Sequence, residues 1–139
     1  MSQKLDSRSR AEFVAWSEPV CADLISERHE RGTCACPETR QLLSAAQSRF
    51  WKALLSGDRH RFMPARRLVA SIRVKANMAQ PEIDAVDDEV LHDLSELVTA
   101  RFLRTPAVAR AYGQVLLEAA LALGTMRGAE AMKTGQPPR

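Results

Sequence analysis

Residues that favour β-strands are scarce in this sequence of 139 residues. There are three isoleucines, one tyrosine and four phenylalanines, and aromatic residues make up 5% of the chain. The core must therefore be built mainly from Leu, Ala and Val. Because Ala and Leu are strong helix formers, the composition predicts an all-α protein.

No apolar segment of signal-peptide or membrane-spanning length is present. The first residues, MSQKLDSRSRAEF, are polar, and the most apolar stretch, residues 107–124, is interrupted by Arg110, Gln114 and Glu118. Polar groups at four-residue spacing would be costly in a membrane span. We therefore expect a cytoplasmic protein with no membrane contact, in which the three cysteines are thiols or ligands.

Motifs of the common enzyme classes are also absent. The six glycines are isolated and form no Gly-x-Gly turn, which excludes phosphate loops and dinucleotide fingerprints. Glu89-x-x-His92 is half of the motif that di-iron helical bundles use, but there is no second copy of it. We expect a non-enzymatic protein that holds no cofactor.

Prolines and glycines divide the chain into five expected helices. Pro19, two residues after Ser17, predicts a break or kink in the first helix near Ser17, because this is the spacing of a first-turn proline after an N-cap serine. The expected helices cover residues 9–31, 37–56, 64–78, 81–104 and a last segment that begins at Pro106. They predict a single compact helical domain over 1–139, with frayed ends at 1–8 and 134–139.

The last helix is apolar on nearly all sides. Its polar side chains, Arg110, Gln114 and Glu118, form one narrow seam. Such a helix is typical of a buried position. The sequence thus predicts a largely buried C-terminal helix, either as the centre of the bundle or as part of a homodimer interface.

Charges are segregated along the middle of the chain. Residues 58–80 carry six Arg or Lys and one Asp, whereas residues 81–100 carry seven Asp or Glu and no basic residue. Neighbouring helices of opposite sign can attract each other. They can also serve as surfaces for partners of matching charge.

The acidic segment provides the main functional hypothesis. Its candidate partner-binding face consists of Asp88, Glu89, Asp93 and Glu96. We expect a small regulator, adaptor or inhibitor that binds a macromolecule, in the first place a protein. Small proteins carried by phages or mobile elements often have this profile, including inhibitors of bacterial defence nucleases.

The basic segment provides an alternative, a nucleic-acid-associated protein. The candidate phosphate contacts are Arg59, Arg61, Arg66, Arg67, Arg73 and Lys75. The expected connector, residues 57–63, is longer than the three- or four-residue turn of a helix-turn-helix. Aromatic residues for base stacking are missing from this segment.

A second alternative is a thiol-redox or metal sensor. All three cysteines and one histidine lie within 16 residues: Cys21, His29, Cys34 and Cys36. These residue types suit zinc, but Cys21 and His29 would be separated by about 12 Å of helical rise. Cys36 directly precedes Pro37 at an expected helix start, where a thiolate is favoured.

Overall fold

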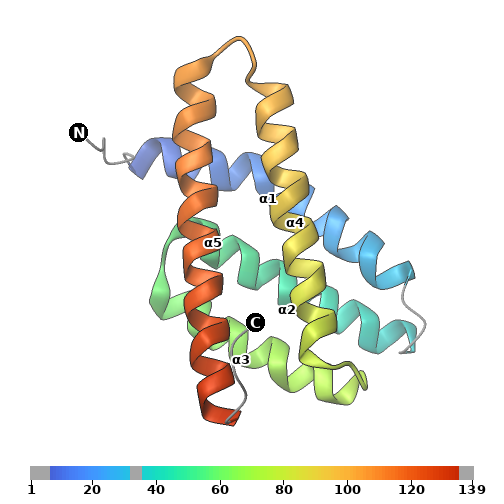
Figure 1. The fold of residues 1–139 in the computed structure, drawn as a ribbon. Coiled ribbons are helices and arrows are strands. Elements are labelled where there is room, and N and C mark those ends of the chain that lie inside the picture. Colours follow the sequence, from blue (N-terminus) through green and yellow to red (C-terminus); the bar gives the residue numbers. More distant parts are fainter. Residues whose placement is uncertain (1–6, 32–35, 135–139) are drawn as a thin grey trace.

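The computed structural model describes residues 7–31 and 36–134 and folds them into five helices without a strand (Figure 1), which confirms the predicted all-α class. The helices are α1 (Ser7–Arg31), α2 (Pro37–Ser56), α3 (Arg59–Lys75), α4 (Gln80–Arg101) and α5 (Pro106–Thr134). None of these five helices is both long enough and apolar enough to cross a membrane.

The helices form two layers. Figure 1 shows α1, α2 and α3 side by side, with the antiparallel α4–α5 hairpin laid across them and its connecting turn projecting past α1. The core lies between the layers, and α2 contributes more of its large side chains than any other helix. The buried residues of α2 include Leu43, Gln47, Phe50, Trp51, Leu54 and Leu55.

The connection between α2 and α3 is shorter than the sequence predicted. Gly57, with a φ of +73°, ends α2, and the Asp58 carboxylate accepts a hydrogen bond from the backbone N–H of His60 at 3.1 Å. This cap starts α3 at Arg59, five residues before Pro64. The connector is therefore two residues long, and the two helices lie side by side as an antiparallel pair (Figure 1), unlike a helix-turn-helix.

Of the predicted break or kink near Ser17, the break is wrong. The helix continues through Pro19, and the Ser17 hydroxyl donates to the Val14 carbonyl at 3.3 Å instead of capping a new helix. Ser17 is buried in line with Phe13, Cys21 and Ile25 at four-residue spacing. Packing along this face holds the helix together across the proline.

The C-terminal helix is buried along one face rather than on most sides. Its buried residues are Tyr112, Val115, Leu116, Ala119, Leu123 and Met126. Leu117 and Leu121, in contrast, are 54% and 64% exposed. Apolar composition did not reveal this, because α5 lies in the outer layer of the fold, where no described helix covers its opposite face.

An aromatic cluster attaches the projecting end of the hairpin to α1. The ring of Tyr112 lies 4.7 Å from that of Phe13 and 5.0 Å from that of Phe102, between ring centres. Trp16 packs against Phe102 at 5.5 Å, nearly edge to face. Such aromatic pairs add stability beyond the apolar area they bury. They therefore hold this end of the hairpin firmly against α1.

Candidate interaction site on the helical hairpin

A buried arginine holds α4 and α5 against α3. Arg66 is 5% exposed and lies 3.0 Å from a carboxylate oxygen of Asp87, 3.1 Å from Asp84 and 3.0 Å from Glu130. Burial alone would lower the pKa of Arg66, but the hydrogen bond to Glu130 and the three carboxylates raise it instead. The guanidinium therefore stays charged and joins three helices.

The carboxylate of Asp87 is the centre of this network. It is fully buried and accepts hydrogen bonds from Gln47 Nε2 and Trp51 Nε1, both at 2.8 Å, besides the bond from Arg66. Burial raises the pKa of Asp87, while the Gln47 bond, the Arg66 charge and the Trp51 bond oppose the rise. Because three hydrogen-bond donors point at this position, a side chain with acceptor oxygens is needed there.

The network also reaches α1. His29 Nε2 lies 2.7 Å from Gln47 Oε1. Because the Gln47 amide nitrogen donates to Asp87, its oxygen must be the acceptor, so His29 carries its proton on Nε2. Burial lowers the pKa of His29, although the bond to Gln47 opposes it. Polar contacts thus link all five helices and fix the orientation of the hairpin.

The predicted acidic face lies on the exposed side of α4 and is partly neutralised. Asp88 pairs with Arg127 of α5 at 2.9 Å, and Glu89 pairs with Arg28 of α1 at 3.1 Å. Asp93 and Glu96 have no Lys or Arg within 4.0 Å among the described residues. These two carboxylates are therefore the ones that can attract an outside cation.

One histidine lies within the acidic face. His92 Nε2 is 3.3 Å from Glu96, and ligand atoms of His92, Asp93 and Glu96 all lie within 4.8 Å of one another. The three residues are carried by one exposed helix. Exposed acidic side chains often come this close without an ion, so the arrangement is a surface network rather than a metal centre.

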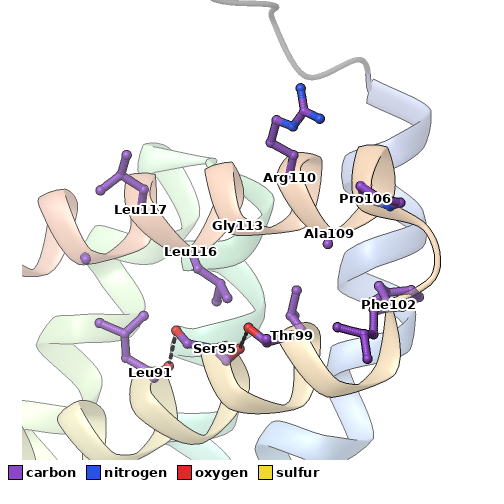
Figure 2. Close-up of a pocket in the computed structure, with 13 residues that line it drawn as sticks. Leu91, Ser95, Thr99, Phe102, Pro106, Ala109, Arg110, Gly113, Leu116 and Leu117 are labelled. Atoms are coloured by element: carbon purple, nitrogen blue, oxygen red, sulfur yellow. Dashed lines mark hydrogen bonds between the residues drawn. The ribbon is translucent and has the colours of Figure 1, made fainter.

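A groove of about 690 Å³ separates the outer sides of α4 and α5 near the end of the hairpin. Figure 2 shows Leu91, Ser95 and Thr99 on one wall, with Leu116 projecting from α5 between the helices. The remaining lining residues are Val98, Phe102, Leu103, Pro106, Ala109, Arg110, Gly113, Leu117 and Ala120. Arg110 is the single charged residue among them.

The hydroxyl groups of Ser95 and Thr99 in the groove are already hydrogen-bonded within α4. The Ser95 hydroxyl donates to the Leu91 carbonyl at 2.8 Å, and the Thr99 hydroxyl donates to the Ser95 carbonyl at 2.9 Å (Figure 2). Its walls therefore favour apolar contacts. Sequence reasoning missed this site, although small residues at positions 109, 113, 120 and 124 share one helical face and signal a close helix contact.

The six candidate phosphate contacts of the basic segment are not equally exposed. Arg66 lies in the core, and Arg73 is half-buried with its Nε 2.9 Å from Gln80 Oε1. The other members are exposed: Arg59, Arg61, Arg67 and Lys75. Arg66 is thus a structural residue rather than a phosphate contact, because three carboxylates already occupy its donors.

The cysteines and histidine of the proposed sensor are only partly placed. Cys34 lies outside the described residues. Cys21 is buried in α1, where desolvation raises the pKa of its thiol to about 12. Cys36 is exposed at the start of α2, and a hydrogen bond with the Thr39 hydroxyl at 3.0 Å lowers its pKa. Cys21 and His29 lie two turns apart on one unbroken helix, which keeps their side chains separate.

No protein-family model, curated protein or solved structure matches this chain. Its function must therefore be inferred from the arrangement of its own residues.

Proposed function

We propose that this protein is a non-enzymatic regulator, adaptor or inhibitor that binds another protein through the acidic face of α4. The observation that carries the proposal is the placement of the four carboxylates Asp88, Glu89, Asp93 and Glu96. They lie on the solvent side of a helix whose other side is anchored by a buried ionic network. A rigid helix that presents fixed charges is suited to recognising a surface of opposite sign.

Two of the four carboxylates carry most of the attraction in this proposal. Asp93 and Glu96 have no Lys or Arg partner among the described residues, whereas Asp88 and Glu89 are already paired with Arg127 and Arg28. The partner surface should therefore be basic and should cover the middle of α4. A phage or mobile-element origin, with a nucleic-acid-binding protein as the target, fits this surface but is not required by it.

The experiment is affinity capture from the native host with the wild-type chain and a reversal variant, Asp88→Lys/Glu89→Lys/Asp93→Lys/Glu96→Lys. A matched control reverses four exposed acidic residues of α1 and α2: Asp23, Glu27, Glu30 and Glu38. Both variants change the net charge equally. The proposal requires that at least one protein is captured by the wild type and by the control variant but is not captured by the α4 variant.

Equal capture by the α4 variant, with an unchanged circular dichroism spectrum, would contradict the proposal. The nucleic-acid alternative is tested with the same samples. It requires duplex or single-stranded DNA to bind the wild type with an affinity that falls steeply with salt, and to bind Arg59→Glu/Arg67→Glu/Lys75→Glu much less.

A further inference from the structure

The exposed apolar residues of the hairpin have the pattern of a surface that fits a second copy of itself. Leu117 and Leu121 are one turn apart on the outer side of α5, at 54% and 64% exposure. Figure 2 shows Leu117 and Arg110 pointing away from the space between α4 and α5. These side chains therefore project outward from the hairpin, where they are accessible to a binding partner.

The same face contains open space beside the leucines. A Cβ atom added at Gly113, Gly124 or Gly128 would meet nothing within 4 Å. Large side chains next to unfilled small positions are the knobs and holes of helix packing. One copy of the face thus supplies both the projecting and the receiving parts of a close helix contact.

Charge along the hairpin is also self-complementary. Its projecting end carries Arg101, Arg104 and Arg110, with no acidic residue between positions 97 and 117. None of these arginines belongs to an ion pair within the described part of the chain. Towards the opposite end, the exposed Asp88 pairs with Arg127 through Oδ1, and no ion pair among the described residues uses its Oδ2. Two hairpins placed head to tail bring unlike charges together.

We propose that this face is a homodimer interface in which two α4–α5 hairpins pack antiparallel about a two-fold axis. Leu117 of each copy lies opposite Leu121 of the other. Counting outward from that pair places Gln114 opposite Gly124 and Arg110 opposite Gly128. Arg110 then fits over the empty position at Gly128 and reaches Asp88, which is held beside it by Arg127.

A second copy is favoured over other occupants because a two-fold interface must be complementary to itself. This face meets that condition in shape, through Leu121 and Gly124, and in charge, through Arg110 and Asp88. The proposal does not depend on the partner proposed above. Glu89, Asp93 and Glu96 lie further round α4 than the residues that line the groove, so the dimer leaves them accessible.

Sedimentation equilibrium of the full chain tests the proposal. The wild type should have about twice the monomer mass of 15.4 kDa at about 100 μM and moderate salt. Leu121→Arg should raise the dimer dissociation constant by about 30-fold or more, the effect of a central interface residue. The matched control is Leu42→Arg, since Leu42 is 61% exposed on α2 and should leave the mass unchanged.

A variant that stabilises the monomer separates dimer loss from misfolding. Gly124→Gln improves helix propensity and fills the open position, so it should weaken the dimer while raising the melting temperature under monomeric conditions. A charge exchange tests the register. Arg110→Glu and Asp88→Arg should each be monomeric alone, and an equal mixture should form a heterodimer, because only mixed pairs place unlike charges together.

A monomeric wild type at 100 μM would overturn the proposal. So would a dimer that Leu121→Arg and Gly124→Gln leave intact, or one that Leu42→Arg disrupts equally. A dimer of the wild type in which the charge-exchanged variants fail to combine would overturn the antiparallel arrangement. Asp88 belongs to both surfaces, so capture of a protein by the acidic face is tested separately with Asp93→Lys/Glu96→Lys, which leaves the dimer contact at Asp88 unchanged.

Discussion

Arg66 of α3 and Asp87 of α4 form an ion pair of 3.0 Å inside the core. The sequence left two uses open for the basic and acidic segments, attraction to each other or binding of partners, and in this pair the two segments meet. Asp84 and Glu130 bind the same guanidinium from the sides. Some charged side chains of the two segments therefore stabilise the packing of α3, α4 and α5 against one another. Only the charged side chains that stay exposed are available to bind partners.

Removing the acceptor at the centre of the network should be costly. Asp87→Leu removes the buried acceptor that Arg66, Gln47 and Trp51 share, and we expect it to lower the free energy of unfolding by about 3–5 kcal/mol. Asp87→Asn keeps an acceptor oxygen and should cost about 1–3 kcal/mol. Urea unfolding measures both.

The control for this prediction is Asp88→Asn. Asp88 forms a single ion pair that is exposed to solvent, so its loss should cost at most about 1 kcal/mol. If Asp87→Leu were as mild as Asp88→Asn, the network would not be stabilising the hairpin.

Stability should depend on pH through His29. Because burial lowers the pKa of His29 below its ordinary 6.5, its contribution is present above that pH and is lost as pH falls through the folded-state pKa. His29→Gln retains a donor for Gln47 without titrating. The free energy of unfolding of this variant should fall less than that of the wild type between pH 6.5 and the acid range.

The raised pKa of Asp87 acts in the opposite direction, because a carboxyl group with a raised pKa favours folding at low pH. Both proteins retain Asp87, so the comparison measures His29 together with its interaction with Asp87. Identical pH profiles for wild type and His29→Gln would show that His29 is not buried in its neutral form.

The two described thiols should react very differently. In a Cys34→Ser background, Cys36 should react with a disulfide reagent at pH 7, since it is exposed and its pKa is lowered. Cys21 should react only after denaturation, because it is buried and its pKa is raised to about 12.

The cause of the Cys36 shift can be tested separately. Thr39→Val removes the hydroxyl that hydrogen-bonds Sγ and should slow the reaction of Cys36, with the rate followed against pH. Rapid labelling of Cys21 in the folded protein would contradict the position of α1.

Pro19 should destabilise α1 without breaking it. Pro19→Ala restores a backbone donor on an exposed helix position and should raise the free energy of unfolding by about 1–3 kcal/mol. Had Ser17 capped a second helix, Ser17→Ala would cost about 1 kcal/mol for lost capping and Pro19→Ala would bring no gain. Thermal unfolding of both variants decides between the two arrangements.

Helix ends and apolar faces were largely readable from the sequence. Pro37, Gly57 and Pro106 lie at the predicted ends, and apolar residues at helical spacing on α4 are buried at Ile83, Val90 and Leu94. These features depend on local backbone chemistry and on helical periodicity, both of which a sequence displays directly.

The polar core was not predicted, although a signal for it exists. Asp87 follows Ile83 by four residues and precedes Val90 by three, and Gln47 follows Leu43 by four. Both therefore occupy apolar stripes, where a polar residue must find a buried partner. The partner, Arg66, comes from another helix, so only the tertiary arrangement identifies it.

The place of α5 in the fold could not be predicted from the sequence for a related reason. The apolar composition of α5 predicts that most of its surface is buried, but it does not identify the helix that buries it. The structure covers one side with this chain and leaves Leu117 and Leu121 outside. Apolar composition thus indicates the need for a partner without identifying whether it comes from within the chain.

The affinity of the captured partner for the purified protein tests the central claim most directly. Asp93→Lys/Glu96→Lys should weaken binding at least about tenfold, because unscreened interface charges of the wrong sign repel. Glu30→Lys/Glu38→Lys, an equal change of charge on α1 and α2, should leave the affinity nearly unchanged, and wild-type binding should weaken with added salt. Equal affinities for all three proteins would show that the acidic face of α4 is not the binding surface.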